Sequence, residues 1–189
     1  MAKGQADLFE VPAKAPAGLR YQADLVGETE EQRIVQELAK LDFAPFEFHG
    51  FLGKRRVASF GRRYDFNEGG MKAAEDMPLF LLPVREAAAR AFGLPAPSFQ
   101  QVLLTEYAPG AAIGWHKDRS VFGDVIGVSL LSSCTFRFRK RAGEKWERRS
   151  IVLEARSAYL LTGSARTEWE HSIPAVTELR YSITFRTVK

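Results

Sequence analysis

The stretch VIGVSLLSSCTFRFRK, residues 125–140, decides the class of fold. Its first part, residues 125–133, is almost continuously apolar, which is typical of a largely buried strand. In TFRFRK (135–140), two phenylalanines alternate strictly with two arginines, so one face of a second strand is apolar and the other is basic. The stretch therefore predicts a β-sheet core.

Other short strands are expected around this core, and helices are expected before it. A first helix is predicted to begin near Thr29, where Thr29 and Gln32 resemble a capping box, and a second to cover roughly 79–92. Helices followed by many short strands indicate an α+β, mainly β fold, with an antiparallel sheet pair or barrel and helices packed on one side. The further strands are predicted at 101–107, 150–153, 158–163 and 180–186.

Length and composition are those of one soluble globular domain. The chain has 189 residues, 46% of them apolar, and a formal net charge of +4. Residues 1–18 are rich in Ala, Pro, Lys and Gly, and we expect a flexible tail there. The single cysteine, Cys134, and the absence of a signal-like or membrane-spanning apolar stretch favour the cytoplasm and argue against a membrane partner.

Two histidines and one aspartate have the composition of a metal site. His116 and Asp118 are two apart, so in an extended segment their side chains point the same way, and His171 could approach from another strand. Two His and one carboxylate on one face of an ion leave positions open, which suits Fe(II) oxygenases. The alternative is a chance His-x-Asp pair and an ordinary hydrogen-bonded His171.

A second pattern concerns the strand RYSITFR (180–186). Arg180 and Arg186 are six apart, so both lie on one face with Ser182 and Thr184 between them. Two inward arginines require anionic partners, and arginine binds carboxylates through paired hydrogen bonds. The alternative is a pair of exposed arginines on an edge strand.

These motifs together resemble the AlkB-like 2-oxoglutarate- and Fe(II)-dependent dioxygenases. The resemblance rests on EYAPGAAIGWHKD (106–118), GDVIGVSLL (123–131), SARTEWEHSIP (164–174) and RYSITFR. It implies a double-stranded β-helix, or jelly roll, with N-terminal helices packed on one sheet. Residues 19–189 would form one domain. Its part 19–98 would hold the helices and, in RRVASFGRRYDF (55–66), a stretch similar to the family's nucleotide-recognition lid, and 99–189 would form the jelly-roll core.

The resemblance also implies roles for particular residues. His116, Asp118 and His171 would ligate Fe(II). Arg180 would pair with the distal carboxylate of 2-oxoglutarate and Arg186 would lie near its chelating carboxylate. The co-substrate site would be completed by Tyr107, Thr105 and Ser182. With O2, the enzyme would oxidatively dealkylate a nucleobase in DNA or RNA, releasing an aldehyde, succinate and CO2.

Candidate contacts to an alkylated nucleic acid come from aromatic and basic residues. In the family, a damaged base is held beside aromatic side chains outside its stack. Several of these side chains could instead belong to the core or to solvated charged faces. The candidates are Trp115, Phe60, Tyr64, Phe66, Arg55, Arg56 and Ser120, with further basic residues at 54, 62–63, 137 and 139–141.

Three departures from well-known DNA-repair members leave the substrate open. Ser120 replaces an acidic residue that helps to read the base, and Thr105 and Ser182 replace asparagines near the co-substrate. The same chemistry on a protein, a lipid or a free nucleoside is one alternative, and a non-catalytic jelly-roll binding module is another. We expect a monomer.

Overall fold

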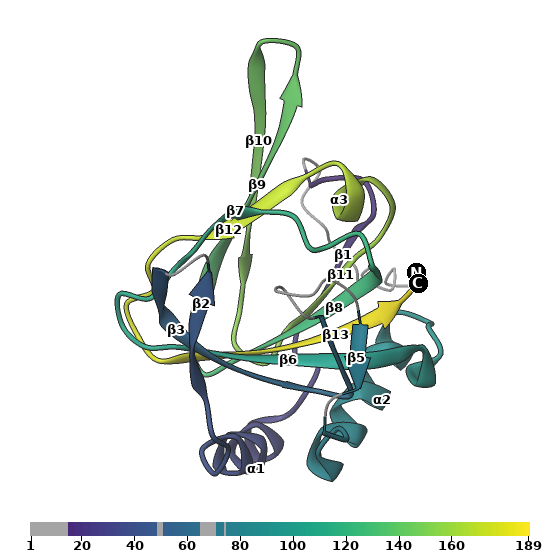
Figure 1. Ribbon diagram of the computed structural model, residues 1–189, viewed down its shortest axis with the longest axis vertical. Coiled ribbons are helices and arrows are strands. Elements are labelled where there is room, and N and C mark those ends of the chain that lie inside the picture. The colour runs from purple at the N-terminus through teal and green to yellow at the C-terminus, as the bar shows by residue number, and fades with distance from the viewer. Residues whose placement is uncertain (1–14, 49–50, 65–70, 74) are drawn as a thin grey trace, which may run out of the picture.

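Two antiparallel sheets face each other in the computed structural model, which describes residues 15–48, 51–64, 71–73 and 75–189 (Figure 1). The larger sheet has the strand order β1-β11-β8-β13-β6-β3-β2, and the smaller has the order β10-β9-β12-β7. The strands are β1 (Leu19–Gln22), β2 (Ala44–Phe48), β3 (Phe51–Phe60), β6 (Phe99–Tyr107), β7 (Ile113–His116), β8 (Phe122–Leu130), β9 (Cys134–Ala142), β10 (Lys145–Leu153), β11 (Ala158–Leu161), β12 (Glu170–Ile173) and β13 (Arg180–Val188), with a separate pair β4 (Arg62–Tyr64) and β5 (Met71–Ala73).

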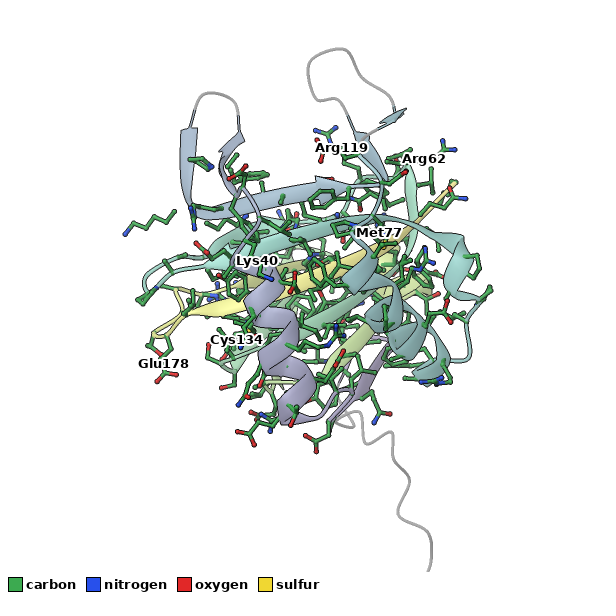
Figure 2. All side chains as sticks on the ribbon, turned by 90° about the horizontal axis from the view of Figure 1, so that it is seen from below. Lys40, Arg62, Met77, Arg119, Cys134 and Glu178 are labelled. Carbon is green, nitrogen blue, oxygen red and sulfur yellow. The ribbon has the colours of Figure 1, made fainter. Side chains whose placement is uncertain are left out.

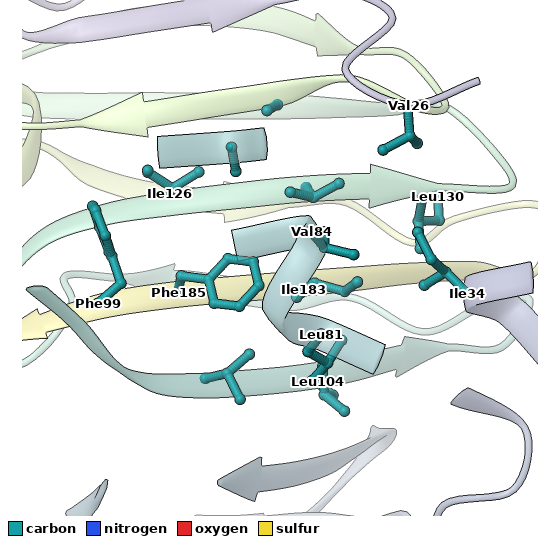
Figure 3. Close-up of a cluster of buried hydrophobic side chains, with 14 of the residues drawn as sticks. Val26, Ile34, Leu81, Val84, Phe99, Leu104, Ile126, Leu130, Ile183 and Phe185 are labelled. Atoms are coloured by element: carbon teal, nitrogen blue, oxygen red, sulfur yellow. The ribbon is translucent and has the colours of Figure 1, made fainter. Parts of the chain in front are cut away.

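The helices cover the outer face of the larger sheet, as predicted. Helices α1 (Glu28–Leu38) and α2 (Leu82–Ala91), the latter preceded by the 3-10 turn η1 (Leu79–Leu81), cross below the sheet (Figures 1 and 2). Ile34 of α1 and Val84 of α2 are buried in one apolar cluster with Ile183 and Phe185 of β13, and Ile34 lies beside Leu130 of β8 (Figure 3). A short turn η2 (Ala96–Ser98) leads into β6, and a one-turn helix α3 (Gly163–Thr167) precedes β12.

A second apolar cluster fills the space between the two sheets. Phe136 and Phe138 of β9 point into it and are almost fully buried, whereas Arg137 and Arg139 between them lie on the outer face. This is the alternation predicted from TFRFRK. The mainly β fold with two antiparallel sheets is thus confirmed.

Several local predictions need correction. The first helix begins at Glu28 with Gly27 as its N-cap, and no side chain caps it, so the capping box of Thr29 and Gln32 is wrong. Thr29 is already inside the helix, where its hydroxyl cannot reach the free N–H groups of the first turn. The region before Phe99 also contributes strands β1, β2 and β3 to the larger sheet. Among the described residues, no helix is long and apolar enough to cross a bilayer.

The docking of α1 gives a test of this packing. Ile34 is fully buried, so we expect Ile34→Ala to lower the free energy of unfolding by about 2–5 kcal/mol through lost burial and an internal cavity. The neighbouring Gln36 is exposed, and Gln36→Ala should change the free energy of unfolding by less than about 0.5 kcal/mol. Urea denaturation of both variants measures the difference, and equal effects would contradict the packing.

Candidate active site

The two candidate histidines meet across a strand pair. His171 of β12 lies directly opposite His116 of β7 in the antiparallel register, and their ring centroids are 4.3 Å apart. Nδ1 of His116 lies 2.8 Å from the carbonyl oxygen of Gly114. Because a carbonyl can only accept, this Nδ1 donates its proton and Nε2 keeps a lone pair for a ligand.

Asp118 completes a cluster with these rings, although not for the reason the sequence suggested. Strand β7 ends at His116, so Asp118 stands in the loop after the strand and strand alternation does not orient it. Its Oδ2 lies 3.7 Å from Nε2 of His171. The loop itself therefore has to be held in place for the carboxylate to reach the histidines.

Burial keeps both imidazoles neutral. Desolvation lowers the pKa of His171 to about 3, against the opposing charge of Asp118, and also lowers the pKa of His116. Burial alone would raise the pKa of Asp118, but the guanidinium charge of Arg186 holds it below its ordinary value. Near pH 7 the cluster thus has two neutral imidazoles and one carboxylate, which are the protonation states that bind a metal ion.

The two arginines of β13 point inward, as the six-residue spacing predicted, but their surroundings differ. Arg186 donates to Oδ1 of Asp118 from Nε at 3.1 Å and pairs with it through Nη2 at 2.9 Å. Arg180 is fully buried and donates only through Nε, to Ser129 Oγ at 3.1 Å. Among the described residues its two terminal nitrogens, Nη1 and Nη2, have no hydrogen-bond partner. A buried cation with two free donors is costly unless an anion accepts them.

The remaining predicted co-substrate residues line the same inner face. The centroid of the Tyr107 ring is 5.1 Å from the guanidinium carbon of Arg180, and burial raises the pKa of Tyr107. Thr105 and Ser182 are buried and stand opposite each other in the β6–β13 register. Arg55 of β3 also belongs here, since its charge acts on both Tyr107 and His116.

Other substrate candidates lie away from this cluster. Trp115 faces outward, with the guanidinium carbon of Arg139 4.6 Å from its ring centroid. Phe60 packs against the core below the larger sheet, and Arg56 pairs with Glu106 on that same face. Ser120 is exposed in the turn after Asp118. Tyr64 belongs to β4, whereas Phe66 lies outside the described residues.

Three further residues support the cluster and carried no predicted role. Ser129 accepts from Arg180, and Gln101 accepts from Nη1 of Arg186 at 3.1 Å. Arg166 of α3 is buried and donates to four backbone carbonyls at distances of 2.6–3.2 Å. Two belong to Asp118 and Arg119 in the loop, and two belong to Phe122 and Gly123 at the start of β8. Gln101 shares strand parity with Thr105 and could have been found that way, whereas nothing in the sequence pattern shows what Arg166 reaches.

The donors fit a divalent ion in kind, whereas His171 and Asp118 stand farther apart than two neighbouring ligands of one ion. Cis donors at about 2.1 Å from an ion stand about 3 Å apart, somewhat closer than the 3.7 Å between His171 and Asp118. Among the described residues no group of three or more His, Cys, Asp or Glu already has the arrangement of a metal site. The other carboxylate oxygen of Asp118, Oδ1, accepts hydrogen bonds from Arg186.

Comparison with known proteins identifies the family. The family model described as "2OG-Fe(II) oxygenase superfamily" matches residues 18–186. The chain belongs to this superfamily. It is an AlkB-like 2-oxoglutarate- and Fe(II)-dependent oxygenase, as the motifs around the two histidines and the arginine strand indicated.

Relatives and one solved structure agree with this membership. The "Alkylated DNA repair protein ALKBH8 homolog" of Arabidopsis thaliana is 29% identical over 83% of this chain and 51% of its own length. The "tRNA (carboxymethyluridine(34)-5-O)-methyltransferase ALKBH8" of Mus musculus is 26% identical over 84% of this chain and 24% of its own length. The chain thus spans about half or less of these relatives. The structure of OsALKBH1 matches with a TM-score of 0.70 at 16% identity, covering 92% of this chain and 97% of that one, which supports the jelly-roll fold.

Arg166 offers a test of how the Asp118 loop is held. We expect Arg166→Met to lower the free energy of unfolding by about 3 kcal/mol or more, because four carbonyls lose a charged donor. Hydrogen exchange at the amides of residues 118–123 should accelerate more than exchange in β13. Arg166→Lys should recover part of both effects, and unchanged exchange in the loop would contradict this role.

Proposed function

We propose that His116, Asp118 and His171 hold Fe(II), and that Arg180 binds the distal carboxylate of 2-oxoglutarate. The observation that carries the proposal is the fully buried guanidinium of Arg180, whose two terminal nitrogens have no hydrogen-bond partner among the described residues. Arg180 lies on the larger sheet, and the histidine pair lies on the smaller sheet that faces it. A carboxylate would accept both donors and neutralise the charge. Membership in the superfamily supports the same pairing and argues against a non-catalytic binding module.

The other residues of the site would position the reactants. Arg186 is fixed between Asp118 and Gln101, so it would orient the metal-binding carboxylate and face the chelating end of the 2-oxo acid. Tyr107, Thr105 and Ser182 line the wall beside Arg180 and would hydrogen-bond the co-substrate. Fe(II), when bound, supplies the open positions at which O2 and the 2-oxo acid react. The chain supplies orientation and a site shielded from bulk water.

The target we propose is an alkylated base in DNA or RNA, which would lose its alkyl carbon as an aldehyde while 2-oxoglutarate yields succinate and CO2. The names of the two ALKBH8 relatives refer to alkylated DNA and to tRNA, which supports a nucleic-acid target. Arg55 adds a cation at the inner face beside His116. A protein, lipid or free-nucleoside target is the alternative, because several proposed base contacts lie away from the cluster.

The role of Arg180 can be separated from a structural one. We expect Arg180→Met to raise the KM for 2-oxoglutarate by about a hundredfold or more, measured as succinate formation. The stability of the metal-free protein should stay the same or increase, since an unpaired buried charge is removed. The exposed Arg90 on α2 provides the control, Arg90→Gln. A destabilised Arg180 variant with unchanged KM would contradict the assignment.

The target can be tested on single-stranded DNA and RNA oligonucleotides that each carry one methylated base. Aerobic incubation with Fe(II) and 2-oxoglutarate should remove the methyl mass and yield formaldehyde in proportion to the oligonucleotide repaired, as measured by mass spectrometry. His171→Ala should abolish the loss. Succinate formation with every oligonucleotide unchanged would favour the alternative targets.

A further inference from the structure

The β9–β10 hairpin carries the positive charge of the molecule. Between Cys134 and Leu153 the sequence has seven Lys and Arg and two Glu, a net charge of +5 against +4 for the whole chain. Figure 1 shows this hairpin extending from the body, at the opposite end of the molecule from α1 and α2. None of the charged residues of this hairpin belongs to the proposed iron and 2-oxoglutarate site between the sheets.

Tryptophans and arginines alternate across the outer face of this sheet. The guanidinium carbons of Arg139 and Arg141 are 4.3 Å and 4.8 Å from the ring centroid of Trp146, which stands opposite Arg141 in the register. Arg139 also lies over Trp115, on the edge strand β7. The row therefore starts directly behind His116 and runs to the hairpin. The row crosses the sheet from β7 to β10, which is three strand spacings or roughly 15 Å. This length corresponds to about four stacked nucleotides at ~3.4 Å each.

A groove of about 380 Å³ lies beside this row, between the hairpin and α3. Its lining includes Trp146, Arg141 and Lys117, and also Glu168 and Glu170, which form ion pairs with Lys140 and Arg139. An aromatic ring and the basic groups of Arg141 and Lys117 thus border the same space as two internal ion pairs. This combination of ring surface and basic groups is what a nucleotide with its phosphate requires.

Some cations of the hairpin are already neutralised and others are not. Arg139 pairs with Glu170, Lys140 with Glu168 and Arg149 with Glu147. No ion pair of Arg141, Lys145 or Arg148 occurs in the part of the chain that the structure describes, and all three residues are exposed. These three charges remain available to an anionic partner.

We propose that this outer face, from Trp115 to the β9–β10 hairpin, binds the single-stranded nucleic acid that flanks the target base. The inference rests on the proposed function and deepens it. Bases would stack on Trp146 and Trp115, while Arg141 and Arg148 contact phosphates from the same face. Lys145, at the start of β10 beside the hairpin turn, would contact phosphate from the end of the hairpin. Trp146 and Trp115 stay half-exposed beside the arginines that lie over them, so bases can stack on these rings. An acidic polypeptide offers carboxylates to the cations but no ring to stack, which favours a nucleic acid.

The test compares two triple variants that remove the same charge. Arg141→Gln, Lys145→Gln and Arg148→Gln change the hairpin, and Arg33→Gln, Lys40→Gln and Arg90→Gln change exposed positions on α1, just after it and on α2, with Lys40 visible on that side in Figure 2. Fluorescence anisotropy measures binding of methylated DNA and RNA strands of roughly 4 and 12 nucleotides. Arg33 and Lys40 pair with Glu30 and Glu37, but surface ion pairs contribute at most about 1 kcal/mol each, and all six side chains are exposed. Thermal unfolding should therefore change little in both variants.

For the longer strand, we expect the hairpin variant to weaken binding at least tenfold and to reduce the slope of log K against log salt by about 2. Trp146→Ala should weaken it about tenfold, with little change in slope. The helix variant should bind as the wild type does, and the shorter strand should respond little to any substitution in the hairpin.

Equal effects of the two triple variants, or no effect of Trp146→Ala, would overturn the proposal. Displacement of the longer strand by polyglutamate, equally in the wild type and Trp146→Ala, would identify an acidic polypeptide as the partner instead. If the wild type repairs a methylated strand and the hairpin variant binds it unchanged, only this inference fails. If the wild type neither binds nor repairs any strand, the proposed function fails with it.

Discussion

Burial of two guanidinium groups between the sheets is the constraint on which the site depends. Arg186 is neutralised within the protein by Asp118, and Gln101 accepts a further hydrogen bond from it. Among the described residues Arg180 forms no ion pair, and its Nε donates to the hydroxyl of Ser129. The difference separates the site into a half built around the carboxylate of Asp118, where we propose that the metal binds, and a half around Arg180, where we propose that an anion binds.

The jelly roll provides this arrangement through strand parity and strand pairing. The inward residues of β13 meet those of β6, so Arg180 faces Tyr107 and Ser182 faces Thr105. The pairing of β12 with β7 brings the two imidazoles together in the other sheet. Asp118 is the exception because it stands in a loop, where strand alternation does not orient its side chain. There Arg166 holds the backbone by donating to the carbonyls of Asp118, Arg119 and Phe122.

Sequence reasoning could reach the elements that are periodic. The alternation at 135–140 and the six-residue spacing of Arg180 and Arg186 are both found in the structure, because side chains in a strand alternate strictly. The direction of Trp115 could have been inferred from its neighbour His116, since adjacent strand residues face opposite sides. The partners of Arg166 could not, because contacts to backbone carbonyls leave no pattern in the sequence. The metal ligands, the cytoplasmic location and the monomeric state stay predictions.

We propose that one metal ion and one diacid bind between the two sheets, in contact with these residues. The most direct measurement is a crystal structure of the protein grown with Mn(II), which binds similar oxygen and nitrogen ligands, and 2-oxoglutarate under anaerobic conditions. We expect anomalous scattering from one ion in contact with His116, Asp118 and His171, and the distal carboxylate on the terminal nitrogens of Arg180. An ion bound elsewhere, or a diacid that leaves Arg180 without a partner, would contradict the account.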